Sequence, residues 1–229
     1  MPDVAAPEDF ADWNEQMIQR YDPAVFAHHP SGAVRWVENK RTRTVLRKLA
    51  AQRGDKILDV GCGCGHILAQ VECAERHALD LSKFMIGLAR ERLGAKATVV
   101  QGDAEKLPFA DASFDRVIAS SLLAHVLHPD AVVDELRRVV KPGGRVIISV
   151  CLEENVERGL QWTRTLRLNK LFFGKSDKPQ AYSVDYHLHH FTLPRLRETV
   201  GSKLKELSLT HVPFVFPVHA IALYERIQD

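Results

Sequence analysis

The feature that most constrains the fold is a glycine-rich loop, Gly61-Cys62-Gly63-Cys64-Gly65, which directly follows a short apolar run at 56–60. An apolar run closed by glycines is typical of a buried strand. Glycine takes positive φ angles most readily and lets a ligand approach the backbone closely. We therefore expect a ligand-binding turn between a strand and a helix, with that helix at about 65–73.

Strands and helices alternate beyond this loop. Further strands are expected at 76–79, 97–100, 114–119 and 145–150, and helices at 33–51, after Ser82, and at 130–140. Such alternation predicts parallel strands with helices on both faces of the sheet. The alternation lapses after Val150 and resumes with strands at 203–210 and 218–224. The expected fold class is α/β: a doubly wound, Rossmann-like, seven-stranded, mostly parallel sheet with an insertion before its last two strands.

Composition excludes several classes of protein. With 31 Lys+Arg against 29 Asp+Glu, the net charge of +2 predicts no whole-protein attraction to nucleic acid or to an anionic membrane. The stretch 207–224 holds no charged residue, but two prolines and two histidines favour two buried strands over a membrane span. The start is acidic and broken by proline, unlike a signal peptide, so we expect a cytoplasmic protein.

Four cysteines are spread as Cys62, Cys64, Cys73 and Cys151. Without an export signal they predict no disulfide framework, and no second Cys/His pair stands at zinc-finger spacing. Cys62 and Cys64 are interpreted as small side chains in a tight loop.

Details of the loop narrow its ligand. A dinucleotide-binding loop has the pattern Gly-x-Gly-x-x-Gly, whereas here Gly65 comes one residue early and His66 holds the sixth position. The Lys-Ser/Thr of a phosphate-binding P-loop is also missing. Asp80 follows Gly61 by 19 residues and could accept hydrogen bonds from both hydroxyls of a ribose. The alternative is a carboxylate that stabilises the N-terminus of the next helix.

Four stretches together carry a family resemblance: 57–65, 78–82, the run Gly102-Asp103-Ala104-Glu105-Lys106-Leu107-Pro108-Phe109, and 136–150 with its Lys141-Pro142-Gly143-Gly144 turn. The chain resembles class I S-adenosylmethionine-dependent methyltransferases of the small-molecule type, similar to those of quinone biosynthesis. The resemblance implies S-adenosylmethionine as cofactor and covers about 45–150. It implies one methyltransferase domain, 1–229, with an N-terminal helical cap (1–44), a cofactor-binding core (45–150), a substrate-side insertion or lid (151–200) and the last strands (201–229).

The resemblance also implies roles for single residues. Gly61 and Gly63 would line the methionine end of the cofactor, with Asp59 nearby through water. Asp80 would hold the ribose, and Leu81 would pack against the adenine.

Three further roles follow from the same resemblance. Asp103 would accept from the adenine amino group, the Ala104 amide would face a ring nitrogen, and Ser120 would close the floor under the methionine moiety. Asp103 as a turn residue and Ser120 as a loop hydroxyl remain the alternatives.

Methyl transfer from a sulfonium mainly needs an aligned acceptor and exclusion of water. The run Ala119-Ser120-Ser121-Leu122 lacks the Asn/Asp-Pro-Pro-aromatic signature of enzymes that methylate exocyclic amines of DNA bases or glutamine side chains. It also lacks any acidic residue to begin a magnesium site like that of catechol methyltransferases. We therefore expect metal-independent chemistry. His125 is the candidate general base, since an imidazole titrates in the useful range. A packing or solvent-facing role for His125 is the alternative.

A second group of histidines lies later in the chain. On an extended segment His187 and His189 would share a face and, with Asp185, could present three metal ligands. Methyl transfer needs no metal, so pocket lining or packing is the preferred interpretation and no metal site is predicted.

The insertion gives the best hint about the acceptor. Six basic residues and one acidic residue lie in 158–178, with Trp162, Phe172 and Phe173 among them. This pattern fits a lid over an apolar or anionic small molecule, a membrane-surface helix, an RNA-contacting patch, or an ordinary solvated helix face.

The preferred function is methylation of an O, N or C atom of a small molecule. An RNA methyltransferase and a noncatalytic S-adenosylmethionine-binding domain are the alternatives, and a nicotinamide-dependent oxidoreductase is disfavoured by the misplaced Gly65. The oligomeric state is not set by the sequence.

Overall fold

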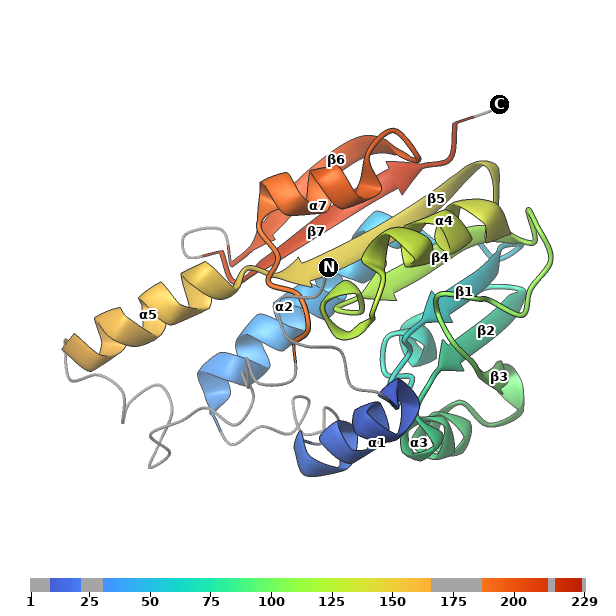
Figure 1. Ribbon diagram of the computed structural model, residues 1–229. Coiled ribbons are helices and arrows are strands. Elements are labelled where there is room, and N and C mark those ends of the chain that lie inside the picture. Colours follow the sequence, from blue (N-terminus) through green and yellow to red (C-terminus); the bar gives the residue numbers. More distant parts are fainter. Residues whose placement is uncertain (1–8, 22–30, 166–186, 214–216, 228–229) are drawn as a thin grey trace.

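The structure is a computed structural model that describes residues 9–21, 31–165, 187–213 and 217–227. Its centre is a seven-stranded sheet with the order β3-β2-β1-β4-β5-β7-β6. The strands are β1 (Lys56–Val60), β2 (Glu75–Asp80), β3 (Thr98–Gln101), β4 (Phe114–Ser120), β5 (Val140–Cys151), β6 (Lys205–Val212) and β7 (His219–Glu225). The first five run parallel, while β7 lies antiparallel between β5 and β6. The predicted mostly parallel α/β sheet is confirmed (Figure 1).

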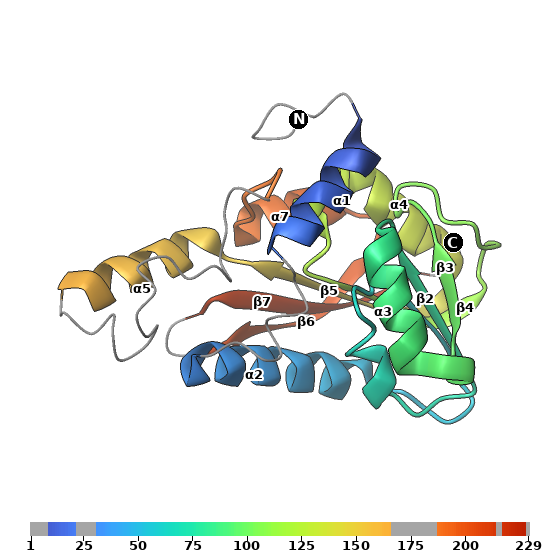
Figure 2. The same cartoon turned by 90° about the horizontal axis from the view of Figure 1, so that it is seen from below.

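Helices cover both faces of this sheet. The helices of the described chain are α1 (Phe10–Tyr21), α2 (Gly32–Leu49), α3 (Lys83–Leu93), α4 (Pro129–Val139), α5 (Glu153–Thr165) and α7 (Leu193–Val200), with short 3-10 turns η2 (Leu68–Gln70), η3 (Gly94–Lys96) and η4 (Leu123–His125). Of these, α5 projects away from the sheet (Figure 1), and α1 packs on α3. Helices α2 and α3 contribute to one apolar core, and α4 and α7 to the other. Seen from below, α2 runs along the outside of β6 and β7 (Figure 2).

Strand β5 shows how the two cores are divided. Val146 and Ile148 pack into the core under α4 and α7, whereas Ile147 packs with Val45 and Leu49 of α2. Successive side chains of a strand point to opposite faces, so a continuous apolar run serves a sheet that is covered on both sides.

The helix expected at 65–73 is wrong. Only the 3-10 turn η2 forms there, because Gly61, Gly63 and Gly65 all take positive φ angles and the chain must start β2 at Glu75. Strand β5 begins at Val140, before the start of the strand expected at 145–150. The Lys141-Pro142-Gly143-Gly144 turn therefore lies inside the irregular first part of β5.

Other expectations agree with the structure. Ser82 caps α3 by accepting from the Met85 amide at 3.2 Å. The charge-free stretch 207–224 contributes most of its described residues to the paired strands β6 and β7, as predicted. Asp185 and the basic residues Arg167, Lys170, Lys175 and Lys178 lie outside the described residues. In the described ranges, no helix has the length and apolar character needed to cross a bilayer.

Candidate functional site

The glycine loop curls over the end of β2. The amides of Gly61 and Cys62 donate to Leu79 O at 2.8 and 3.0 Å, and the Gly63 amide donates to Asp80 Oδ2 at 2.8 Å. Gly61 has φ +68°, and a Cβ there would lie 2.7 Å from the Leu122 side chain. A Cβ on Gly63, at φ +52°, would meet nothing within 4 Å. The loop therefore presents its backbone to open space at the carboxyl edge of the sheet.

Asp80 ends β2 and is 9% exposed. Besides the Gly63 amide it accepts the Ser82 amide on Oδ1 at 3.0 Å, so it also supports the start of α3 as the alternative interpretation held. Each carboxylate oxygen keeps a second lone pair for a further donor. Burial raises the pKa of Asp80 even though both amides lower it. A ligand that offers hydroxyl donors would relieve this desolvation.

Asp59 lies within β1 and is 1% exposed. Its Oδ2 atom has no hydrogen-bond partner among the described residues. Burial, followed by the negative charge of Asp80, raises the pKa of Asp59 to about 7, and Arg41 opposes that rise. A buried carboxylate oxygen without a partner is costly, and it marks a place where a cationic or donor group would be stabilised.

Arg41 of α2 reaches the same edge of the sheet and was not foreseen from the sequence. It is 7% exposed and donates to Ser120 Oγ at 2.6 Å and to Ser121 Oγ at 3.3 Å. Its guanidinium also pairs with Glu38 at 2.7 Å. Although burial opposes ionisation of Glu38, Arg41 and His219 hold the pKa of this carboxyl well below its ordinary range.

Ser120 ends β4, and Ser121 follows it directly. Ser120 Oγ lies 2.9 Å from Ser149 Oγ of β5, and the Ser121 amide donates to Ser149 O at 2.9 Å. Ser121 has φ +58°, a backbone conformation that residues other than glycine rarely adopt. Such a conformation costs roughly 1–3 kcal/mol and persists because the surrounding hydrogen bonds fix it, often beside a functional site.

The loop after β3 borders Asp80 on its other side. The Gly102 amide donates to Asp80 O at 3.0 Å. Asp103 is exposed and its Oδ1 accepts from the Glu105 amide at 2.8 Å, which agrees with the alternative interpretation as a turn residue. Ala104 is buried, and Leu81 is half-buried with its carbonyl bonded by Gln101 Nε2 at 3.1 Å.

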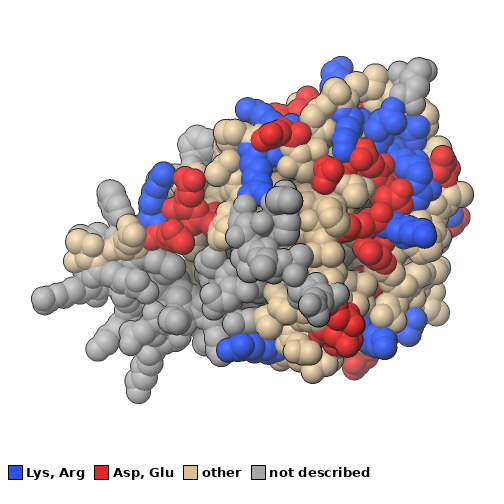
Figure 3. All heavy atoms as spheres, in the orientation of Figure 1, with Lys and Arg blue, Asp and Glu red and all other residues tan. Residues whose placement is uncertain are grey.

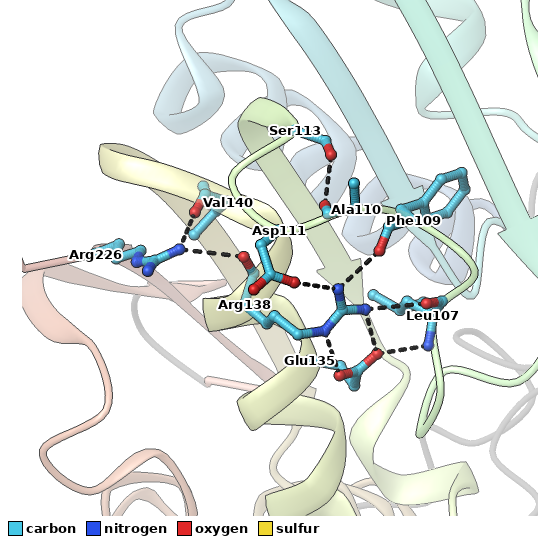
Figure 4. Close-up of polar contacts among 9 residues, drawn as sticks. All are labelled: Leu107, Phe109, Ala110, Asp111, Ser113, Glu135, Arg138, Val140 and Arg226. Atoms are coloured by element: carbon cyan, nitrogen blue, oxygen red, sulfur yellow. Dashed lines mark hydrogen bonds and ion pairs between the residues drawn. The ribbon is translucent and has the colours of Figure 1, made fainter.

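Helix α4 holds this loop through a cluster of polar contacts (Figure 4). Arg138 donates to the carbonyls of Phe109 and Leu107 at 2.7 and 3.0 Å, and pairs with Asp111 at 2.7 Å. Glu135 pairs with Arg138 and accepts from the Leu107 amide at 2.6 Å. The Arg138 side chain keeps the pKa of Glu135 low. One fork of guanidinium donors thus fixes both ends of a short irregular segment.

His125 lies in η4, the turn after β4, and its ring centroid is 4.6 Å from that of His187. His187 contacts Glu153 at the start of α5, whereas His189 is buried and its Nε2 lies 2.9 Å from Val126 O. His187 and His189 therefore have different partners and do not converge on one common position. Within the part of the chain that the structure describes, no group of three or more His, Cys, Asp or Glu residues could hold a metal ion.

The structure thus brings most of the expected site together. Gly63 meets Asp80, Gly61 meets Leu122 next to Ser120, and Asp59 lies within the electrostatic influence of Asp80. Asp103 bonds within its own turn, and the His125 amide donates to Leu122 O at 2.8 Å, which joins η4 to the end of β4.

Comparison with a family model finds similarity in the part of the chain that holds this site. Residues 58–148 match the family model described as "Methyltransferase domain". A demethylmenaquinone methyltransferase of Clavibacter sepedonicus is 42% identical over 106 residues, which are 44% of this chain and 43% of that protein. A malonyl-[acyl-carrier protein] O-methyltransferase of Erwinia pyrifoliae is 42% identical over 159 residues, 66% of this chain and 60% of that protein.

The same fold is found in the solved structure of the [4+2]-cyclase SpnF, with a TM-score of 0.71, 16% identity and full coverage of both chains. At that identity the likeness concerns the fold alone. The chain matches only 43% of the length of the demethylmenaquinone methyltransferase. The match to the family model, over 58–148, includes the glycine loop, Asp80 and Ser120.

Proposed function

Residues 58–148 form a class I S-adenosylmethionine-dependent methyltransferase domain, and from this premise we propose that the whole chain transfers a methyl group to a small-molecule acceptor without a metal ion. The observation that carries the proposal is the junction of the Gly63 amide with Asp80 beside the unpartnered carboxylate oxygen of Asp59. A buried carboxylate oxygen without a partner at this edge supports the binding of a ligand that brings a donor or a positive charge.

The residues at this edge fit S-adenosylmethionine. Asp80, desolvated and with lone pairs to spare, would accept from the ribose hydroxyls. The open space above Gly63 is a cradle that only a residue without a side chain leaves free. At the amino-acid end, Asp59 would face the ammonium group and Arg41 the carboxylate, because opposite charges compensate each other best where water is excluded.

The remaining cofactor residues play positional parts in this proposal. Leu81 and Ala104 flank the adenine, and Asp103, by capping its own turn, presents the backbone of the loop to it. Ser120 would form the floor of the methionine end, where Arg41 and Ser149 fix its hydroxyl. These roles are the ones that the family resemblance implies, and the position of each residue at or just after the carboxyl end of a strand is compatible with them.

When bound, S-adenosylmethionine supplies an electrophilic methyl group on a sulfonium. The chain has to hold the acceptor in line with that methyl group and keep water away. Strain at Ser121 and the packing of Leu122 over Gly61 fix the wall between the two sites. We assign 151–200 to the acceptor-side lid and 1–44 to a cap over the cofactor, with α1 packed on α3.

A small molecule is favoured over RNA as acceptor. The basic stretch at 158–178 is the feature on which an RNA contact would depend, and in its described part Arg158 pairs with Glu154 at 3.2 Å. On the face of the molecule drawn in Figure 3, blue and red groups are interspersed over the described surface. RNA binding depends on basic groups gathered in a patch or stripe.

The decisive test combines binding with transfer. Calorimetric titration with S-adenosylmethionine should give a saturable 1:1 isotherm that Asp80→Asn weakens and Asp115→Asn, at the opposite edge of the sheet, leaves unchanged. Incubation with methyl-labelled S-adenosylmethionine and a cell extract should then place label in the low-mass, nuclease-resistant fraction. Label in nuclease-sensitive polymer would replace the small molecule by RNA, and binding without transfer would leave a noncatalytic domain.

A further inference from the structure

Glu153 stands at the point where β5 gives way to α5, and two histidines converge on it. It is 5% exposed. Its Oε1 lies 2.5 Å from His187 Nδ1, and its Oε2 contacts His190 Nδ1. A buried carboxylate is stabilised by a donor, so His187 Nδ1 is assigned the role of donor to Glu153 Oε1, while Glu153 Oε2 makes no hydrogen bond within the described residues.

This cluster is joined to the cofactor loop through η4. The Leu188 amide donates to Ala124 O at 2.8 Å, which fixes the backbone next to His187 on that turn. The ring of His187 packs edge-on against His125, and the His125 amide donates to Leu122 O at 2.8 Å. Leu122 in turn packs over Gly61. A continuous series of contacts therefore links Glu153 to the methionine end of the proposed cofactor site.

The tautomer of His187 follows from this contact. With Nδ1 donating to a carboxylate, the lone pair of the ring lies on Nε2. Burial lowers the pKa of His187 to about 4, so the ring is neutral at pH 7 and its Nε2 carries a lone pair. The charged or titratable groups that face it are Glu153 from α5, His125 from η4, and His190, which shares the Glu153 carboxylate.

We propose that His187 is the proton acceptor for a hydroxyl-bearing methyl acceptor, and that Glu153 is the positioning residue that fixes its tautomer. The assignment rests on the proposed methyl transfer and narrows it to O-methylation. A carboxylate that orients an imidazole and stabilises the imidazolium is a recurring arrangement for activating a hydroxyl.

The step balances without a further reactant. The acceptor oxygen forms a bond to the methyl carbon, the carbon–sulfur bond breaks, and its electron pair stays on sulfur as a neutral thioether. The hydroxyl proton moves to Nε2 of His187, and Glu153 compensates the positive charge of the resulting imidazolium. The proton then leaves to solvent, and the neutral ring is restored.

The first test needs no turnover. In ¹⁵N NMR spectra of the full chain at pH 7.5, the ring of His187 should show Nδ1–H in the wild type and lose that preference in Glu153→Ala. A wild-type ring with its proton on Nε2 would overturn the positioning role of Glu153.

The second test measures transfer from methyl-labelled S-adenosylmethionine to the low-mass fraction of the extract, with His187→Gln, His125→Gln and, as control, His211→Gln on β6. His187→Gln should slow labelling about 100-fold or more, with the Kd for S-adenosylmethionine within twofold. Its residual rate should rise about tenfold per pH unit, because ionisation of the acceptor hydroxyl replaces the missing base. A merely structural histidine would not produce that slope.

The outcomes separate the two proposals. Wild-type labelling with an undiminished rate in His187→Gln overturns the assignment alone, as does a loss confined to His125→Gln. A wild-type protein that binds S-adenosylmethionine and labels nothing overturns the proposed function together with this step.

Discussion

The Arg41 guanidinium of α2 donates to the Ser120 hydroxyl at the end of β4 over 2.6 Å, across 79 residues of sequence. The same side chain pairs with Glu38 one turn earlier in its helix. One buried arginine thereby ties a helix that packs on β5 and β7 to the edge where the cofactor is proposed to bind. The position of that edge thus depends on a charge inside the core.

Arg41→Lys tests this link. Lysine keeps the charge but cannot bond Glu38 and Ser120 at once with a planar fork. We expect the Kd for S-adenosylmethionine to rise about tenfold, which corresponds to about 1.4 kcal/mol. Calorimetry on Arg41→Lys and on Arg43→Lys, an exposed arginine of the same helix, would measure it. Equal affinity in both variants would argue against a contact between Arg41 and the cofactor.

Asp80→Asn should weaken cofactor binding more strongly. The amide oxygen can still accept one backbone hydrogen bond, but the variant loses the charge and one acceptor of the pair that receives Gly63 and Ser82. Loss of a hydrogen bond to a charged group costs about 1.5–3 kcal/mol, or roughly 10- to 150-fold in Kd. A folded Asp80→Asn protein with wild-type affinity would refute the ribose assignment.

Asp59 makes the stability of the ligand-free protein depend on pH. Its folded pKa, about 7, lies above the ordinary value of 3.8. Between these values the folded chain holds a proton that the unfolded chain has lost, so this contribution to stability is present below about pH 4 and is lost as pH rises to about 7. Asp59→Asn should therefore be more stable than the wild type at pH 7.5, by roughly 2–4 kcal/mol, and little different at pH 4.5. Urea unfolding at both pH values would measure it, and a pH-independent difference would contradict the assignment.

The Arg138 cluster should control the mobility of the loop after β3. In Glu135→Gln the ion pair with Arg138 is lost and the Leu107 amide keeps only a neutral acceptor. We expect amide hydrogen exchange at 104–109 to speed up about tenfold, while exchange in β1 stays unchanged. Glu154→Gln on exposed α5 is the matched control. Unchanged exchange would mean that backbone contacts alone hold the loop.

Chelation should leave methyl transfer intact. The described residues hold no cluster able to bind a metal ion, and the proposed step needs only a positioned base. Labelling rates with and without excess EDTA, after dialysis, should agree within error. A loss that zinc or magnesium restores would revive the segment around His187 as a ligand site.

The sheet could be predicted from the sequence because its strands carry a signal that needs no partner. Apolar runs such as Lys56–Val60 and Phe114–Ser120 are bounded by glycines and polar residues, and the structure confirms them within a residue or two. Asp80 could be foreseen as a site residue for a similar reason, since it ends the strand that follows the glycine loop and pairs in parallel with β1.

The acceptor side could not be predicted in the same way. Glu153 and His187 are 34 residues apart, and only the tertiary fold brings them together. The sequence did contain an indication that Arg41 is buried, although its charge predicts exposure to solvent. Val34, Glu38, Arg41, Val45 and Leu49 are all buried at helical spacing, so two charged residues occupy a core stripe. A rule that assigns charge to solvent places them on the wrong face.

The antiparallel hairpin also has a consequence for how the molecule is made. Strand β7 lies between β5 and β6, although it follows both in the chain. During synthesis, β6 emerges with no neighbour in the sheet to pair with, and it must wait until His219–Glu225 has left the ribosome. The nascent chain therefore exposes the unpaired edge of β5 until a late stage. Chaperone contact during translation would be concentrated at that edge.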